Sequence, residues 1–416
     1  MTVCLLGFSI LAGAQTQRPT EDPYTLPANT ATAGSATLTG PTNRKPGWSI
    51  DPDAGVVYQH GDFRWTGWGY GEHVFRPEGD GFWRRVRQGM EFDLPRLAPH
   101  YRTVLVCEVD FTDTNFFRDR SKLNIVENLY GTLEDADDPG KFRVLFGENT
   151  HILSREDNLS SGNLPTINRS LVLEEHGSVH SFGTQFGVEL VKAVTPRYTV
   201  AFAALDNRGS LNTSNPRYVI GNDLAIKVSA LLVQDEGHGR KFSVAVALDQ
   251  TRDIRAGTWT FLSAVAGQAM GTAPASGNES TGEIEAAYTD RIGKHPYSLE
   301  SEHFLTTFSK TRTHILGGYG LGQFSLFQTA RAGEFDPFFR YDWVHLSANG
   351  SNDPILQQAL RTGFNWNLPS SRQRVNFHVE YARNFLSVPP MTTPVKASSN
   401  ELGLEVRFSA TRYIRY

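Results

Sequence analysis

Residues 374–381 read RVNFHVEY, and every second side chain in this stretch is apolar or aromatic. Successive side chains of a β-strand point to opposite faces of the sheet, so the stretch predicts a strand with one apolar and one polar face. The same alternation recurs in residues 141–149, 241–249, 360–368 and 401–409. No long segment of the sequence has the helical period, and we therefore expect an all-β protein.

The connections between these predicted strands alternate in length. Short connections near 94–96, 135–140 and 369–372 alternate with long ones near 112–123, 150–178 and 386–400. Strands of about ten residues joined in this way are typical of a transmembrane antiparallel β-barrel. The alternative is a soluble β-sandwich or propeller, whose strands are usually about five or six residues long. Strand length and the aromatic residues on the apolar faces favour the barrel.

The alternation also predicts the size of the barrel and its lipid-facing side. An odd number of segments can be placed, whereas bacterial single-chain barrels have an even number of strands. We expect about sixteen strands, with about eighteen as the alternative, and one misplaced hairpin between about residues 206 and 330. Six apolar side chains are expected to face lipid or a neighbouring protomer: Phe364, Trp366, Phe377, Val379, Leu404 and Val406.

Composition excludes several classes of protein. The 416 residues include 40 Lys and Arg against 44 Asp and Glu, a formal net charge of −4. This balance lacks the excess of basic residues typical of nucleic-acid-binding proteins. No apolar stretch reaches the roughly eighteen residues of a transmembrane helix. The 2 cysteines, Cys4 and Cys107, are too few for a disulfide framework or a multi-thiolate metal site, and we expect no cofactor.

The first residues resemble an export signal. An apolar stretch over 3–12 leads to the sequence AGA at 12–14, a pattern typical of a signal-peptide cleavage site. No Lys or Arg precedes it, which leaves a start codon assigned too late, or a buried N-terminal segment, as alternatives. Residues 15–50 are rich in Pro, Thr, Ala, Gly and Asn and are predicted to form a disordered linker. The predicted organisation is a signal peptide over 1–14, a linker over 15–50 and a barrel over 51–416.

Four segments carry a resemblance to a known family. They are FWRRVRQG at 82–89, CEVDF at 107–111, VLFGEN at 144–149 and GFNWN at 363–367. In order, over about 80–416, they resemble the phosphate-selective porin O and P family of bacterial outer membranes, although Asn367 stands where that family usually has Tyr. The resemblance implies an outer-membrane porin, a water-filled channel through which small hydrophilic solutes, including anions such as phosphate, diffuse passively. It also implies a homotrimer.

The sequence carries no strong catalytic signature. The motifs H-E-x-x-H, G-x-S-x-G and G-x-x-x-x-G-K-[ST] are all absent from it. The glycines of 318–322 lack the βαβ context of a dinucleotide site and suit a curved barrel strand better. His176 and His180 lie beside a predicted strand, so we expect no metal site there. We expect no enzyme, with two alternatives left open: an outer-membrane enzyme, and a non-conducting barrel that serves as an anchor or assembly partner.

Charged side chains on the polar faces are expected to line the lumen, because the opposite faces meet lipid. The candidate pore-lining and constriction residues are Arg85, Arg87, Arg102, Arg143, Arg155 and Arg169. Arginine suits a filter because its charge persists and its planar donors match phosphate or carboxylate. Acids nearly equal bases among the lumen-facing positions, so a hydrated, charge-paired interior is the alternative to anion selectivity.

The long connection 150–178 is predicted to be the third external loop and to fold into the lumen. It holds five apolar residues that could anchor it there: Ile152, Leu159, Leu164, Ile167 and Leu171. A loop exposed to solvent would have less need of apolar anchors, although a loop that covers the entrance of the barrel could also need them. With the nearby wall arginines, the loop is expected to form the constriction, while its own four acidic residues oppose an anion-attracting field.

Overall fold

The computed structural model describes most of the chain from residue 46 onward. The described residues are 46–51, 55–61, 63–75, 81–98, 100–111, 126–150, 152–159, 164–173, 184–206, 222–235, 237–263, 268–329, 332–347, 355–368, 375–388 and 395–409. The predicted signal peptide and the predicted linker as far as residue 45 lie outside them. A first strand, β1 (Gly47–Asp51), lies within the last residues of that linker.

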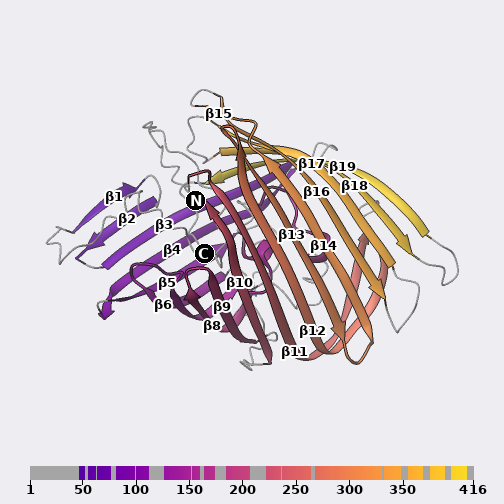
Figure 1. Cartoon of the computed structure of the whole chain (residues 1–416), viewed down its shortest axis with the longest axis horizontal. Helices are drawn as coiled ribbons and strands as arrows, with labels where there is room; N and C mark the ends of the chain where they lie inside the picture. Colours follow the sequence, from indigo (N-terminus) through magenta and orange to yellow (C-terminus); the bar gives the residue numbers. More distant parts are fainter. Residues whose placement is uncertain are drawn as a thin grey trace, which may run out of the picture.

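Sixteen antiparallel strands form a closed barrel, as predicted (Figure 1). In chain order they are β3 (Phe63–Phe75), β4 (Gly81–Ala98), β5 (Tyr101–Asp110), β6 (Val126–Asp135), β7 (Phe142–Thr150), β8 (Thr184–Thr195), β9 (Tyr198–Asp206), β10 (Asp223–Asp235), β11 (Arg240–Ser263), β12 (Gln268–Ile292), β13 (His295–Phe308), β14 (Thr313–Phe324), β16 (Gly333–Ser347), β17 (Ile355–Asn367), β18 (Val375–Val388) and β19 (Val395–Ser409). Each pairs with the next one named, and β19 returns to pair with β3. Closure supplies the backbone hydrogen bonds that lipid cannot.

Besides the barrel wall, the described residues include three shorter strands and a short helix. β1 pairs with β2 (Gly55–His60), and β2 pairs in turn with the first half of β3. β15 (Phe327–Thr329) pairs with the start of β16. The helix, α2 (Arg155–Asn158), lies in the connection that follows β7. Within the described ranges, no helix is long and apolar enough to cross a membrane.

Burial follows the predicted two-residue period. On β13, Glu302 and Phe304 are almost fully buried, whereas Leu305 is 52% exposed. On β19, Leu404 is exposed and the next residue, Glu405, is fully buried. The predicted wall residues of β17, β18 and β19 share this outer face, although Val406, opposite Phe377 of β18, is covered by its neighbours. The outer face is therefore apolar and the inner face carries the charges.

The alternation in the sequence also predicts strands near 55–65, 240–249 and 256–266, and all three are wrong in their bounds. The strand expected at 55–65 is β2 followed by a separate barrel strand, β3, which runs on to Phe75. The segments expected at 240–249 and 256–266 form the single strand β11, whose pairing with β12 shifts register between Thr251 and Gly257. These β-bulges interrupt the two-residue period, and merging the two segments gives the even number of strands.

The connections fall into two sets at opposite ends of the barrel. One end has short turns, such as 99–100 between β4 and β5 and 196–197 between β8 and β9. The other end has longer connections over 76–80, 111–125 and 151–183. In barrels of this kind the short turns face the periplasm and the long connections face the exterior. The connection between β7 and β8 is therefore the third external loop, as predicted.

Candidate functional site

The third external loop enters the barrel lumen. Its two described stretches, 152–159 and 164–173, are mostly buried, and we refer to them together as the lumen loop. All five predicted anchors are at most 7% exposed: Ile152, Leu159, Leu164, Ile167 and Leu171. A barrel of sixteen strands is wide enough for an aqueous channel, so a segment buried inside it narrows the passage. The prediction of an inward-folded third loop is confirmed.

The local sequence of the lumen loop shapes its first stretch. Ser154 caps α2, because its Oγ accepts a hydrogen bond from the backbone N–H of Asp157 at 3.0 Å. Asn158 donates its side-chain amide back to the carbonyl oxygen of Ser154 at 2.6 Å. The resulting single turn holds Glu156 in a fixed, buried position.

Glu156 is held by an arginine of β16. Arg340 of β16 is fully buried, and its guanidinium donates to both carboxylate oxygens of Glu156, with the Nη2–Oε2 distance at 3.2 Å. The backbone N–H of Ser170 donates to the same carboxylate at 2.9 Å. Arg340 also donates to Thr166 Oγ1 at 3.1 Å and to Asp342 Oδ1 at 2.7 Å. This cluster ties both stretches of the lumen loop to the wall.

The second stretch of the lumen loop is held by β18 and β19. The backbone N–H of Ile167 donates to Glu380 Oε2 at 2.8 Å. Arg407 donates to the carbonyl oxygens of Leu164 at 2.6 Å and Thr166 at 3.1 Å. Charged side chains thus satisfy backbone groups that would otherwise lack partners inside the barrel.

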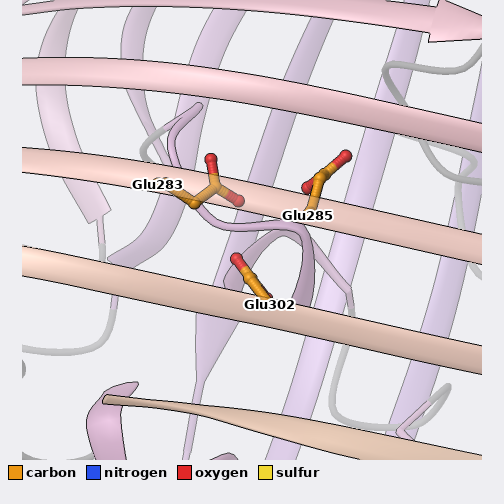
Figure 2. A group of neighbouring side chains, drawn as sticks. All are labelled: Glu283, Glu285 and Glu302. Atoms are coloured by element: carbon orange, nitrogen blue, oxygen red, sulfur yellow. The ribbon is translucent and has the colours of Figure 1, made fainter. Parts of the chain in front are cut away.

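Three carboxylates converge where the first stretch meets β12 and β13 (Figure 2). Glu283, Glu285 and Glu302 each place a carboxylate oxygen within 4.8 Å of the others, a set that could hold a metal ion. The ammonium of Lys227 lies 2.7 Å from Glu285 and 3.6 Å from Glu283, and it donates to the carbonyl oxygen of Leu153 at 2.9 Å. Lys227 therefore already supplies a cation to this cluster, and a metal ion would have to displace it.

Apolar packing completes this filled side of the lumen. Residues 171–173 of the lumen loop, Leu-Val-Leu, are buried together with Leu153. They pack against apolar side chains that β13, β14 and β16 turn inward: Phe304, Phe308, Ile315, Val344 and Leu346. Burial of this kind stabilises by roughly 25 cal/mol per Å² of apolar surface removed from water. The lumen loop is therefore packed as a core element.

The opposite wall carries two of the predicted arginines next to the lumen loop. Arg85 of β4 lies 3.8 Å from Glu72 of β3. Arg87 lies 2.9 Å from Glu108 and 3.0 Å from Asp110, both on β5. Each predicted arginine here therefore has a carboxylate partner on a neighbouring strand.

Two more predicted arginines lie near the short-turn end. Arg102 of β5 is 2.5 Å from Glu134, and Arg143 of β7 is 2.9 Å from Glu189. On β5, Val104 and Val106 point inward and lie between Arg102 and Glu108, the residue that pairs with Arg87. They belong to a buried apolar belt formed by Trp68, Val104, Val106, Tyr130 and Leu145. Arg102 and Arg143 thus form a second charged layer, distinct from the one beside the lumen loop.

The last two predicted arginines belong to the lumen loop itself. Arg155 is buried, and its Nη2 lies 3.4 Å from Glu300 of β13. Arg169 is partly exposed and lies 3.4 Å from Asp157, with further hydrogen bonds to loop carbonyl oxygens. The charge of Arg169 also acts on Arg85 of β4, so the two side chains lie within electrostatic range of each other. The structure thus brings Arg85, Arg87 and Arg169 together and places Arg155 on the filled side.

Arg84 is an inward-facing arginine that the two-residue period misses. The pairing of β3 with β4 shifts register so that Glu72 opposes Arg85 while His73 opposes Trp83. This bulge leaves Arg84 on the same side as Arg85, where it donates to the carbonyl oxygen of Ile167 in the lumen loop. Two adjacent arginines in an alternating strand were the available signal, because one of them would otherwise face lipid.

The pairs on the two sides of the lumen differ in exposure. On the β4–β7 wall the arginine is the more exposed partner: the side chain of Arg102 is 37% exposed against 8% for Glu134, and that of Arg85 is 16% exposed against 0% for Glu72. Around the lumen loop both partners are buried, as for Arg340. On the β4–β7 wall the arginine side chains are therefore more exposed to water than the carboxylates they pair with.

No protein-family model matches the chain, and no curated protein matches it. Solved outer-membrane proteins share its fold. The outer-membrane-expressed OmpT of Vibrio cholerae is 11% identical, with 85% of this chain and 99% of that chain covered and a TM-score of 0.53. The anion-selective porin from Comamonas acidovorans is 12% identical, with 83% of this chain and 99% of that chain covered and a TM-score of 0.50. The outer membrane channel DcaP of Acinetobacter baumannii is also 12% identical, with 83% of this chain and 97% of that chain covered and a TM-score of 0.53.

At these identities the likeness concerns the fold. It agrees with the closed antiparallel barrel and its apolar outer face, which only a lipid environment accommodates. The chain is therefore a β-barrel of the bacterial outer membrane.

Proposed function

We propose that this barrel is a porin-type channel through which small hydrophilic solutes diffuse passively, with a preference for anions. The observation that carries the proposal is the unequal exposure along the β4–β7 wall, where each arginine side chain is more exposed than the carboxylate it pairs with. A solute beside this wall meets positive charge first. The near equality of acids and bases in the sequence therefore does not cancel the field at the surface of the passage.

The charged layer beside the lumen loop supplies the constriction in this proposal. Arg84, Arg85 and Arg169 converge there from the wall and the loop. The contact between Arg85 and Glu72 is 3.8 Å, longer than a hydrogen bond, so the planar donors of Arg85 can turn to a passing phosphate or carboxylate. Passive transport needs such contacts to be weak, because a solute held tightly would not leave.

Planar-bilayer recording of the purified protein tests the proposal. Stepwise conductance is expected, with a reversal potential in a KCl gradient that favours chloride. Arg85→Ala and Arg169→Ala should each shift that potential toward potassium. Arg240→Ala is the matched control, because Arg240 pairs with Asp290 beside a short turn, away from the lumen loop. If Arg240→Ala shifts the reversal potential as much as the other two variants, Arg85 and Arg169 do not form the selectivity filter.

A silent bilayer would instead support the non-conducting barrel that acts as an anchor, since the lumen loop fills one side of the lumen. Conductance without a preference for chloride would indicate a porin whose arginines pair with carboxylates and do not select the solute. We propose transport rather than enzymatic activity, because no catalytic motif accompanies the barrel.

The family and the assembly are part of the same proposal. The motif at 82–89 that resembles the phosphate-selective porin O and P family contains Arg84, Arg85 and Arg87, so phosphate is the first anion to test. We also propose a homotrimer, as one solved OmpT of Vibrio cholerae is described as a trimer. Chemical crosslinking of the protein in detergent, followed by gel electrophoresis, would show three bands for a trimer and one for a monomer.

A further inference from the structure

Two carboxylates at the start of β16 point inward next to each other. Glu334 and Asp336 are both buried. Other inward carboxylates lie beside an arginine, as Glu134 lies beside Arg102. Among the described residues, neither Glu334 nor Asp336 forms an ion pair with a lysine or arginine, and the charge that acts on Glu334 is that of Asp336. Two buried negative charges without a cation are unfavourable, because burial removes the water that would screen them.

Ser325 places a hydroxyl beside this pair. The pairing of β14 with β16 continues past the end of β14, because the backbone N–H of Leu326 donates to the carbonyl oxygen of Phe335 at 2.9 Å. Ser325 therefore lies next to Asp336, close enough to act on its carboxylate. Ser325 is 7% exposed, and its Oγ has no hydrogen-bond partner in the described part of the chain. A hydroxyl buried in this way costs free energy unless a ligand or water uses its lone pairs.

Asn365 supplies a second uncharged oxygen on the same inner face. It is the register partner of Asp336 on β17, and the Cβ atoms of directly opposed residues lie about 5 Å apart. Its Nδ2 donates to the carbonyl oxygen of Pro165 in the lumen loop at 3.0 Å. Its Oδ1 is buried and lacks a hydrogen-bond partner within the described ranges. The amide therefore holds the loop with its nitrogen and leaves its oxygen for a ligand.

We propose that Ser325, Glu334, Asp336 and Asn365 bind one calcium ion on the inner wall of the barrel. All four offer oxygen atoms, the ligands that calcium takes, and the two carboxylates balance its charge. They come from β16, β17 and the residue after β14, an irregular set that suits the flexible coordination of calcium better than the strict octahedron of magnesium. The three-carboxylate cluster of Figure 2 differs, because Lys227 already supplies its cation.

The proposed ion would also strengthen the hold on the lumen loop. Bound to Oδ1 of Asn365, it fixes the amide whose Nδ2 donates to Pro165. Anything that binds only the folded protein stabilises it by mass action. Calcium should therefore raise the unfolding temperature of the barrel, whether or not the barrel transports solutes.

Equilibrium dialysis with radioactive calcium chloride tests the site in the full-length, folded protein in detergent, after treatment with EDTA. The wild type should bind calcium at this site with a Kd of about 0.1–1 mM, since only two of the ligands are charged. Glu334→Gln/Asp336→Asn keeps the side-chain shapes and should weaken binding at least about tenfold. Ser325→Ala removes only a hydroxyl and should weaken it by a smaller factor. Only protein that migrates as the heat-modifiable, folded band is compared.

Glu283→Gln is the matched control, because it removes a buried inward carboxylate from the other cluster. It should bind calcium as the wild type does, and calcium should raise its unfolding temperature equally. Four results would overturn the proposal: no calcium binding by the wild type, wild-type affinity in both the double variant and Ser325→Ala, a loss of binding in Glu283→Gln alone, or equally strong competition by magnesium chloride.

Discussion

On the side of β10, β16 and β19, the lumen loop buries Lys227 and Arg340 completely, whereas on the side of β4–β7 Arg102 and Arg143 keep contact with water. The same residue types, paired with the same kinds of carboxylate, therefore do two different things. Buried pairs fix the position of the loop, because either partner left alone would be an uncompensated charge inside the protein. Partly exposed pairs contribute little to stability but set the charge that a solute meets.

The difference between the two sides of the lumen is expected to be largest for a variant of Arg340. Arg340→Ala leaves Glu156 buried without its counter-ion and Asp342 with only Arg361, and removing one partner of a buried pair costs about 3–5 kcal/mol. We expect a lower unfolding temperature and a larger conductance as the lumen loop leaves the wall. Thermal unfolding and single-channel recording check both effects. Arg143→Ala, on the open side, should leave the unfolding temperature nearly unchanged, and an equal loss there would refute the distinction between the two sides.

Lys227 tests whether the filled side depends on charge balance. Lys227→Met removes the ammonium between Glu283 and Glu285, with an expected loss of about 3 kcal/mol in the free energy of unfolding. The double variant Lys227→Met/Glu285→Gln removes one of the stranded charges and should recover part of the loss. Denaturant unfolding of the four proteins of this cycle measures the coupling. Additive losses would mean that the lysine acts by its packing and not by its charge.

Residues 403 and 404 test the two faces of one strand. Leu404→Arg places a charge on the lipid face and should cost up to about 2–4 kcal/mol, less if it lies far from the midplane. Gly403→Arg points inward, where a Cβ would lie 2.6 Å from Ile167 Cδ1, so it should push the lumen loop aside and change conductance. Unfolding in detergent or lipid and bilayer recording separate the two effects. Equal folding defects would reject the assigned phase.

The smallest expected effect is that of pH on the Glu156 contact. Burial alone would raise the pKa of Glu156, but the Arg340 guanidinium and the hydrogen bonds from Ser170 bring it below its ordinary value of 4.5. With a lowered pKa, the contribution of Glu156 to loop binding is complete above about pH 4.5 and is lost as pH falls through the lowered value. Conductance should therefore be insensitive to Glu156 between about pH 8 and pH 5. In Glu156→Gln the acid step attributable to this residue should vanish; an unchanged step would assign it elsewhere.

The fold could be predicted largely from local pattern, because lipid on one side and the lumen on the other impose a two-residue period on every strand. The period fails where this contrast is weak. The outer face of β3 carries Gly67, Gly69 and Gly71, which give no apolar signal, so the sequence pattern predicts the strand too early in the chain. In β11 the bulges after Thr251 shift the phase, so the sequence pattern predicts two strands where the structure has one.

Only those parts of the site that leave a pattern in the local sequence could be predicted. The anchors of the lumen loop were identified because apolar residues such as Ile152 and Ile167 are conspicuous in a long polar connection. Their partners were not, since Arg340 lies 184 residues from Glu156 and nothing in the sequence links the two. The bulge that turns Arg84 inward is likewise set by the pairing of β3 with β4, which one strand's sequence does not specify.

The contact of Arg407 with Leu164 joins residues 243 positions apart, and that of Glu380 with Ile167 joins residues 213 apart. Such contacts form slowly, because the chain must close a very long loop before it gains any interaction. The strands that hold the lumen loop on this side, β18 and β19, are also synthesised about two hundred residues after it. We therefore expect the loop to settle late in folding, after the sheet has curled around it, and the barrel to pass through a wide, loop-free intermediate.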